Sequence, residues 1–340
     1  MRKPVTLITG AGGEIGHGLV TRLAASGAAI VALDVHPIDA ALVPLVARVF
    51  TGSITDTSLL DRLLAEFEVG LVFHLAALLS TRAEFTPVTA HHVNVEGTLN
   101  LLEFSQRQGE SHGRSVVFVY PSSIAAYGIP DLETKMHAGP VREDEFAQPR
   151  TMYGCNKLYC EQLGRYYTRH YKQLSADAIP HVDFRCVRFP GLMSSATVPA
   201  GGTSDYAPEM IHAAANGEPY TCFVRPDTTI PFMVMPDAID ALLALGEARR
   251  DRLTRTAYNV AAFSASAADI REVVARAFPA AAISYRVDEK RQGIVDSWPA
   301  AVDDSAARAD WGFSPRFDFP RAFSDYLVPT IRERYRSLKV

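Results

Sequence analysis

The chain has only four cysteines and two tryptophans among its 340 residues, and it has no long apolar run. Four cysteines are too few for a disulfide framework in a chain this long, so we expect four reduced thiols in or near the core of a cytoplasmic protein. No stretch reaches the roughly 18 to 20 apolar residues of a membrane-spanning helix, and the N-terminal residues lack the pattern of a signal peptide. These absences argue against a membrane protein and against a disulfide-stabilised secreted domain.

The chain also lacks a block of like charges. It carries 34 basic and 38 acidic residues, and its densest basic cluster, at 249–255, alternates with acids. That cluster is typical of a solvated helix end, so we expect no nucleic-acid partner. The ten histidines form no HExxH motif and no Cys/His grouping with metal-ligand spacing, so no metal site is predicted.

Short apolar segments alternate with helical patterns through the first half of the chain. Apolar segments occur at 5–9, 29–33, 46–51, 71–75, 116–120 and 183–189. Helical patterns occur at 16–26, 57–67, 91–108 and 151–172, and Gly27 is expected to end the first of them. Continuously apolar strands alternating with helices predict a parallel sheet covered on both faces, which is an α/β, doubly wound, Rossmann-type fold.

The regular alternation stops after Pro190. Residues 191–230 are rich in Gly, Ser, Thr and Pro, helical patterns return at 236–249 and 267–277, and 258–260 resembles a late strand. We therefore predict a dinucleotide-binding domain at 1–190 with a return segment at about 231–262. The remaining segments, 191–230 and 263–340, are predicted to form a smaller C-terminal substrate-binding part built on the main sheet. The polar segment 128–149 is predicted to be a surface loop over the site.

A glycine-rich sequence, TGAGGEIG, directly follows the first predicted strand. Glycines at 10, 13 and 16 allow a tight turn, a close approach of the backbone to a pyrophosphate, and packing of the next helix near the strand. The N-terminus of that helix would face the phosphates. Glu14 lies within the motif, so its carboxylate is expected to point away from them.

An acidic residue, Asp34, ends the second predicted strand. A carboxylate at that position accepts hydrogen bonds from a ribose diol and repels a 2′-phosphate, and no Arg or Lys stands beside it. These features favour NAD over NADP as the cofactor. The alternative is that Asp34 only caps a turn.

Tyr153 and Lys157 form a YxxxK pair, and residues four apart share a face of a helix. An ammonium group near a phenol is expected to lower the pKa of the tyrosine, which makes it usable as an acid or base. About thirty residues earlier, Ser122 and Ser123 end the fifth predicted strand, where open α/β sheets place their ligands. A serine hydroxyl there can hold a substrate oxygen, although it can also simply cap the strand end.

These motifs, together with HLAA at 74–77 and SSIAAYG at 122–128, resemble the extended short-chain dehydrogenase/reductase superfamily. The resemblance implies a catalytic group of Tyr153, Lys157 and Ser123, with Ser122 the less favoured serine. It implies an NAD site that includes Gly10, Gly13, Glu14, Ile15, Gly16, Asp34, Ser53, Ile54, Leu75, Ala76, Ala77, Asn94, Tyr153, Lys157 and Phe189.

The second half of the chain is similar to the short-chain type of L-threonine 3-dehydrogenases. The similar stretches are HLAALLS, PGLMSS, GGTSDYA, YNVAAFS, DSWP and DDSAARADWGF. This resemblance implies oxidation of the 3-hydroxyl of L-threonine to 2-amino-3-ketobutyrate, with Tyr153 as the base and hydride transfer to NAD. The substrate site it implies contains Ser80, Ser122, Ser123, Tyr153, Gly202, Thr203, Asp205 and Trp298.

In that site Ser80, Gly202 and Thr203 would donate to the substrate carboxylate, Asp205 would accept from its ammonium group, and Trp298 would close one wall. Each also has an alternative role, such as a glycine hinge, a capping aspartate or a core tryptophan.

Two other functions stay open from the sequence. One is a sugar or sugar-acid oxidoreductase or epimerase with the same catalytic group. Nucleotide-sugar enzymes use an arginine near 228–232, where this chain has Thr228 and Thr229, although Arg225 could substitute. The other is a non-catalytic NAD-sensing regulator, which often lacks the tyrosine or lysine. The resemblance also implies a homodimer formed through the Tyr153 helix. Leu158, Leu163 and Tyr167 are candidate contacts, and these apolar positions fit the core equally well.

Overall fold

The computed structural model describes residues 3–199 and 201–337. Its centre is a seven-stranded, fully parallel sheet with the strand order β11-β7-β5-β4-β1-β2-β3. The strands are β1 (Lys3–Thr9), β2 (Ile30–Asp34), β3 (Arg48–Thr51), β4 (Phe67–His74), β5 (Val116–Ser123), β7 (Val182–Phe189) and β11 (Ala257–Asn259). The predicted doubly wound α/β fold is confirmed, and the late strand at 258–260 does return to the main sheet.

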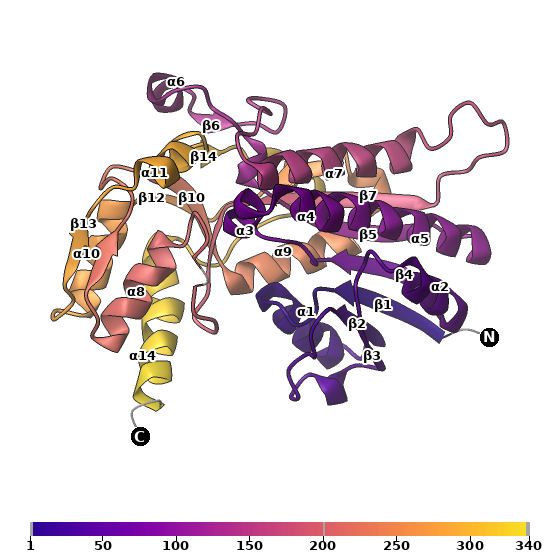
Figure 1. Ribbon diagram of the computed structural model, residues 1–340, viewed down its shortest axis with the longest axis horizontal. Helices are drawn as coiled ribbons and strands as arrows, with labels where there is room; N and C mark the ends of the chain where they lie inside the picture. Colours follow the sequence, from indigo (N-terminus) through magenta and orange to yellow (C-terminus); the bar gives the residue numbers. More distant parts are fainter. Residues whose placement is uncertain (1–2, 200, 338–340) are drawn as a thin grey trace.

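Helices cover both faces of this sheet (Figure 1). On one face lie α2 (Thr57–Glu66), α5 (Gly97–His112) and α7 (Met152–Arg169); on the other lie α1 (Glu14–Ala25) and α9 (Met235–Glu247). Each helix buries an apolar stripe, such as Leu19, Val20 and Leu23 of α1, against the strands. Gly27 follows α1 with a φ of +80°, the left-handed conformation expected of a residue that ends a helix.

The predicted helix at 91–108 is longer and less regular than its pattern indicated. It begins as α4 (Pro87–His91), passes through a π-helical turn (His92–Glu96) and continues as α5. A short helix, α3 (Ser80–Phe85), precedes it.

The C-terminal part has its own sheet and its own core, whereas the sequence had suggested a part built on the main sheet. Strands β8 (Gly191–Met193), β10 (Thr229–Val234) and β12 (Phe263–Ser266) form this sheet. Two strand pairs add to it: β9 (Tyr220–Cys222) with β13 (Ile283–Tyr285), and β6 (Pro140–Val141) with β14 (Ala301–Val302). The helices of this region are α6 (Leu132–His137), α8 (Tyr206–Asn216), α10 (Ala267–Ala277), α11 (Glu289–Asp296), α13 (Phe319–Arg321) and α14 (Val328–Ser337), whereas α12 (Ser305–Trp311) packs into the core of the main sheet.

The segment 128–149 is not the plain surface loop that its polarity predicted. It contains α6 and β6, and Ile129 and Val141 are fully buried. The backbone N–H of Ile129 donates to the carbonyl of Ser297 (2.8 Å), so the segment is tied to the residue before Trp298. Its apolar anchors are too widely spaced to show a strand or helix period.

Three of the four cysteines are buried as expected, but Cys155 is exposed on α7. In the part of the chain that the structure describes, no helix combines the length and apolar content needed to cross a membrane. Residues 3–199 and 201–337 likewise hold no group of three or more His, Cys, Asp or Glu side chains placed to bind a metal ion.

Candidate active site

The glycine loop joins β1 to α1 at the carboxyl edge of the main sheet, and two of its glycines have no room for a side chain. Gly10 has a φ of +69°, and a Cβ on it would lie 2.7 Å from the backbone nitrogen of Ala76. A Cβ on Gly16 would lie 2.5 Å from the carbonyl oxygen of Gly10. The loop therefore presents bare backbone beside the first turn of α1, which fits a dinucleotide pyrophosphate.

Asp34 stands beside this loop at the end of β2. Its carboxylate accepts from the backbone N–H of Gly12 (2.9 Å) and of His36 (3.0 Å), and the side chain is half-buried. It does cap turns, and it also places negative charge at the outer end of the loop. A carboxylate there suits the ribose diol of NAD and opposes the 2′-phosphate of NADP.

Asn94 and Ser53, both predicted to contact the cofactor, are engaged with their own surroundings. The Asn94 amide is paired with the backbone of Leu78 in both directions, because it accepts from the N–H (2.7 Å) and donates to the carbonyl (3.0 Å). Asn94 thus holds the segment that contains Leu75, Ala76 and Ala77. The Ser53 hydroxyl is bonded within its own turn, to Thr55.

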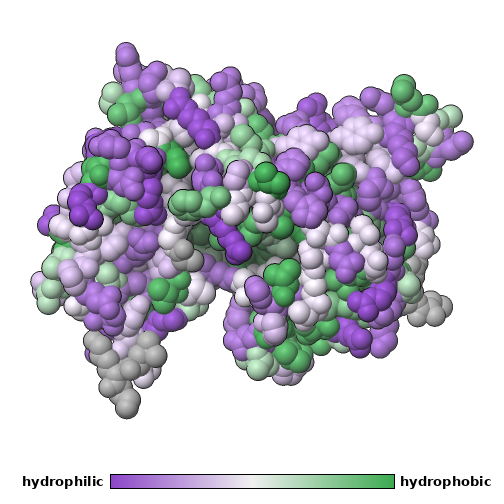
Figure 2. Space-filling view, viewed as in Figure 1, coloured by the Kyte–Doolittle hydropathy of each residue, from purple (hydrophilic) through white to green (hydrophobic). Residues whose placement is uncertain are grey.

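The other predicted cofactor residues divide by exposure. Ile54 and Phe189 are buried, whereas Ile15, Leu75, Ala76 and Ala77 are half-buried at the carboxyl edge of the sheet. Glu14 points away from the loop as expected, and its carboxylate accepts from the hydroxyl of Thr197 (2.5 Å) in the C-terminal part. Figure 2 shows the face hollowed between these two parts of the molecule.

Tyr153 and Lys157 both lie near the start of α7, whose N-terminus is capped by the Thr151 hydroxyl (3.0 Å to the N–H of Gly154). Lys157 is buried, and its ammonium group donates to the carbonyl of Pro121 on β5 (2.6 Å). The same ammonium lies 4.4 Å from the ring centroid of Tyr120 and 5.5 Å from that of Tyr153. The predicted helical pair is therefore brought against the end of β5.

The electrostatics of this pair differ from the sequence prediction. We expected Lys157 to lower the pKa of Tyr153, but desolvation of the phenol by the surrounding protein raises it above its ordinary value. Burial also lowers the pKa of Lys157 to about 8. The ammonium is held by a carbonyl and an aromatic face, neither of which is an anion, so desolvation prevails.

The two serines at the end of β5 have different roles. The Ser123 hydroxyl accepts from the N–H of Ala125 (3.1 Å), so its own hydrogen stays available for a substrate oxygen. The Ser122 hydroxyl is buried and donates to Glu161 (2.5 Å) on the core side. This contact removes Ser122 from the predicted substrate set and leaves Ser123.

Glu161 belongs to a buried ion pair that the sequence analysis missed. Arg188 of β7 donates to both of its carboxylate oxygens (2.9 and 2.7 Å), and both side chains are 3% exposed. Glu161 lies one helical turn after Lys157 and bonds the neighbour of Ser123, so it links the catalytic helix to the catalytic strand end. The signal was available in the sequence: a charged residue within the apolar run of β7, and an acid four residues after Lys157.

The glycine-rich loop 201–205 forms part of the predicted substrate site, and the structure revises two of its residues. The N–H of Gly202 donates to the Asp205 carboxylate (2.6 Å), so it is not free to bind a substrate. Asp205 therefore first closes this loop. The hydroxyls of Thr203 and of Ser80, the first residue of α3, make no hydrogen bond to any other described residue. Trp298 is buried in the core of the C-terminal part.

Arg225 does not replace the missing arginine near Thr229. Its guanidinium is paired bidentately with Asp296 (2.9 Å for each bond) and also contacts Asp227. Since both acids neutralise it, it offers no free charge for a diphosphate.

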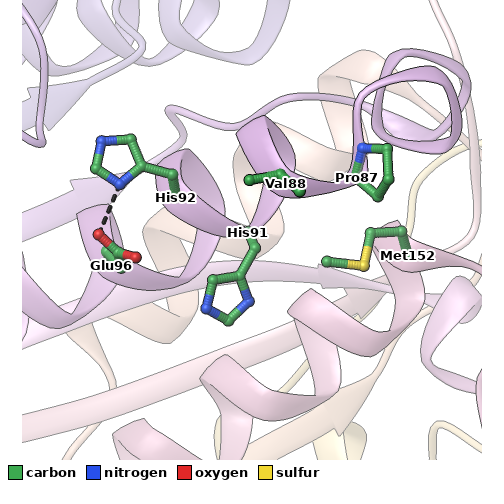
Figure 3. Close-up of a pocket in the computed structure, with 6 residues that line it drawn as sticks. All are labelled: Pro87, Val88, His91, His92, Glu96 and Met152. Carbon is green, nitrogen blue, oxygen red and sulfur yellow. Dashed lines mark hydrogen bonds and ion pairs between the residues drawn. The ribbon is translucent and has the colours of Figure 1, made fainter.

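A shallow groove opens next to the catalytic helix (Figure 3). It is lined by Pro87, Val88, His91, His92, Glu96 and Met152, with His92 paired to Glu96 (2.6 Å). Of the three candidate dimer contacts on α7, Tyr167 is buried in the core of the main sheet and Leu163 packs against that core, which is the second of the two roles open from the sequence. The large apolar or aromatic side chains exposed on α3, α4 and α7 are Phe85, Val88, Tyr159 and Tyr166.

Comparison with known proteins shows a family to which the chain is similar over most of its length. Residues 6–261 match the NAD dependent epimerase/dehydratase family. Among curated proteins, an uncharacterized epimerase/dehydratase of Staphylococcus haemolyticus is 37% identical over 284 residues, covering 83% of this chain and 82% of its own. A counterpart from Staphylococcus aureus is 36% identical over 315 residues and covers 92% of both chains.

Solved structures of similar proteins include L-threonine dehydrogenase from Clostridium difficile, with a TM-score of 0.85 and 32% identity over 98% of this chain and 99% of that one. The holo form of a GalE-like L-threonine dehydrogenase from Cupriavidus necator has a TM-score of 0.82 and 34% identity over 98% and 100%. With the glycine loop, Asp34 and the Tyr153–Lys157 pair in place, the chain is an NAD-dependent dehydrogenase that belongs to the NAD dependent epimerase/dehydratase family.

Proposed function

We propose that the protein oxidises the 3-hydroxyl of L-threonine to 2-amino-3-ketobutyrate, as a step in threonine breakdown. The observation that carries the proposal is the extent of its likeness to L-threonine dehydrogenases. That likeness covers 98% of this chain at 32–34% identity, so it includes the C-terminal part. In this proposal residues 1–190 and about 231–262 hold NAD, and 191–230 and 263–340 form the substrate part.

In the proposed mechanism Tyr153 removes the proton of the substrate hydroxyl, and Ser123 donates a hydrogen bond to the same oxygen. A bound NAD would supply the hydride acceptor for this oxidation. Lys157, whose ammonium is fixed by Pro121, adds positive charge near Tyr153 and would stabilise the phenolate as the proton arrives. With its raised pKa, Tyr153 is protonated at neutral pH in the free enzyme, so it needs the positive charge of Lys157 to act as a base.

The substrate would be held by small hydroxyl groups. Ser80 and Thr203, whose hydroxyls have no other partner among the described residues, would donate to the carboxylate. Asp205 has one carboxylate oxygen that accepts no hydrogen bond from any described residue, and this oxygen would accept from the ammonium group. Trp298 would close one wall. These groups suit a small zwitterion better than a diphosphate.

The engagement of Arg225 by Asp296 and Asp227 weighs against the sugar-nucleotide alternative, since that substrate needs phosphate ligands in this region. The presence of Tyr153, Lys157 and Ser123 at one edge of the sheet weighs against the non-catalytic regulator. Three buried, unbridged cysteines favour a reducing compartment, so we place the protein in the cytoplasm.

A homodimer is part of the proposal. Val88 of α4 and Phe85, the last residue of α3, are each 82% exposed. Helices α4 and α7 lie side by side beside the groove of Figure 3. A second copy of the chain would cover these apolar side chains. A Val88→Glu/Phe85→Glu variant that elutes as a monomer, where the parent elutes as a dimer, would support this interface; a monomeric parent would exclude it.

Initial-rate assays with NAD and L-threonine test the activity. The parent protein is expected to form NADH with NAD and to do so poorly with NADP. Tyr153→Phe should lose at least about a hundredfold in rate, and Tyr159→Phe, an exposed tyrosine on the same helix, should retain full activity. NAD binding without turnover of L-threonine would refute the substrate and direct the search to sugar acids and nucleotide sugars.

A further inference from the structure

The loop 201–205 is held from two sides by contacts that no part of the proposed chemistry requires. Gly201, with a φ of +83°, and Gly202 each present a carbonyl oxygen outward from the loop. The Gly201 oxygen accepts from the Thr81 hydroxyl of α3 (2.8 Å). The Gly202 oxygen accepts from Nη2 of Arg291 in α11 (2.8 Å). The backbone of Gly201 and Gly202 therefore connects α3, which carries Ser80, with α11, which ends two residues before Trp298.

Arg291 is placed to hold this loop rather than to form an ion pair. Its guanidinium carbon lies 3.3 Å from the ring centroid of Phe223, so the planar group is stacked on an aromatic face. The same Nη2 makes a longer contact with the Gly201 carbonyl (3.5 Å). Within residues 3–199 and 201–337 no carboxylate forms a salt bridge with it, unlike Arg225 in the same part of the chain. Stacking leaves the edge of the guanidinium free to donate to carbonyls in a fixed direction.

The loop that Arg291 holds carries Thr203, the residue proposed to bind the substrate carboxylate, and Asp205. A small zwitterion offers few contacts, so its affinity depends on each binding group being held within a fraction of an ångström. Asp205 closes the loop internally through the N–H of Gly202. That internal bond does not fix the position of the loop relative to Ser80. The two external contacts, from Thr81 and Arg291, do.

We propose that Arg291 is a positioning residue for substrate binding: stacked on Phe223, it fixes the Gly201–Asp205 loop against α3 so that Thr203 and Ser80 face one ligand. This inference rests on the proposed function for the identity of the substrate. The placement of the loop by Arg291 does not depend on it.

The test compares Arg291→Met with Arg286→Met, the same substitution at an exposed arginine five residues away. Arg291→Met is expected to raise KM for L-threonine roughly 10- to 100-fold, with kcat changed less than about threefold and NAD affinity less than about twofold. Arg291→Lys should recover part of KM, because an ammonium can donate to one carbonyl but lacks the planar fork. Arg286→Met should resemble the parent in every assay.

Hydrogen exchange of the peptide containing 201–205 gives a readout that needs no turnover. Faster exchange in Arg291→Met, with unchanged exchange in the main sheet and in Arg286→Met, supports the proposal. Unchanged exchange of this peptide, or a loss of NAD affinity that matches the loss of substrate affinity, overturns it. If the parent does not oxidise L-threonine, the proposed function fails, and the exchange measurement still decides whether Arg291 positions the loop.

Discussion

The loop proposed to hold the cofactor (Gly10–Gly16, the cofactor loop) and the loop proposed to hold the substrate (Gly201–Asp205, the substrate loop) are both glycine-rich, yet the structure positions them by different means. The cofactor loop is fixed by backbone: Gly10 and Gly16 lie so close to neighbouring main chain that no side chain fits. The substrate loop is fixed by side chains, namely Asp205, Thr81 and Arg291, while a Cβ on Gly201 would meet nothing within 4 Å. A loop fixed by backbone tolerates no change of residue, whereas one fixed by side chains can be shifted by single substitutions.

The largest expected effect is at Lys157 of α7, whose ammonium group lies against the end of β5. Lys157→Met should reduce activity by about 10²- to 10⁴-fold. This substitution should not destabilise the fold at pH 7. Burial lowers the pKa of Lys157 from 10.5 to about 8, so keeping the charged ammonium group buried at pH 7 costs the parent protein free energy. That cost fades between pH 8 and pH 10.5, so the stability of the parent should rise relative to that of the variant over this range. Urea unfolding at pH 7 and pH 10 measures this, and a variant much less stable than the parent at pH 7 would contradict it.

The next largest effect compares a buried ion pair beside the main sheet with a partly exposed ion pair of the C-terminal part. Glu161→Gln leaves Arg188 buried without its anion and should lower the free energy of unfolding by about 3 to 5 kcal/mol. Asp296→Asn breaks the pair with Arg225, which is 31% exposed, and should cost about 1 kcal/mol. Thermal or urea unfolding of both variants gives the comparison. Equal losses would show that burial does not separate the two pairs.

A substitution beside the cofactor loop should alter selectivity with little effect on the fold. Asp34→Ser removes the carboxylate beside the ribose position, and should weaken NAD relative to NADP by roughly 10- to 100-fold, the scale of one or two lost charge-assisted hydrogen bonds. The control is Asp39→Ser, an exposed aspartate nearby. Titration of each cofactor against both variants measures the ratio. An unchanged ratio in Asp34→Ser would show that Asp34 only caps its turns.

The smallest expected effect concerns His74, which lies fully inside the dinucleotide half. Its ring nitrogens bond the hydroxyls of Thr9 (2.8 Å) and Thr98 (2.9 Å), and burial lowers its pKa to about 3. The unfolded chain takes up a proton near pH 6.5 and the folded chain does not, so folding stability falls as the pH drops below about 6.5. This group should account for about 1 kcal/mol of loss between pH 7.5 and pH 5.5. His74→Asn should flatten that slope; an unchanged slope would assign the acid sensitivity to other groups.

The contrast between backbone and side-chain contacts also explains which parts of the fold and of the site could be predicted from the sequence. The strands of the main sheet, α1 and the glycine loop follow from local rules, since apolar runs and positive-φ glycines leave a direct mark on sequence. Ser122 was misplaced because adjacent residues of a strand face opposite sides, and only the contact with Glu161 shows which side each takes. The hold of Arg291 on Gly202 joins residues 89 apart, and nothing in either local pattern indicates it.

The path of the chain between the two parts has a consequence for how this protein can change. After β7 the chain enters the C-terminal sheet, returns for α9 and β11, leaves again for β12, and comes back to the main core with α12 before ending in α14. No single cut separates the two cores, because main-core residues such as Leu242 and Phe313 alternate along the chain with residues of the C-terminal core. The substrate part therefore cannot be exchanged between relatives as a block, and new specificity has to arise through substitutions made in place, one side chain at a time.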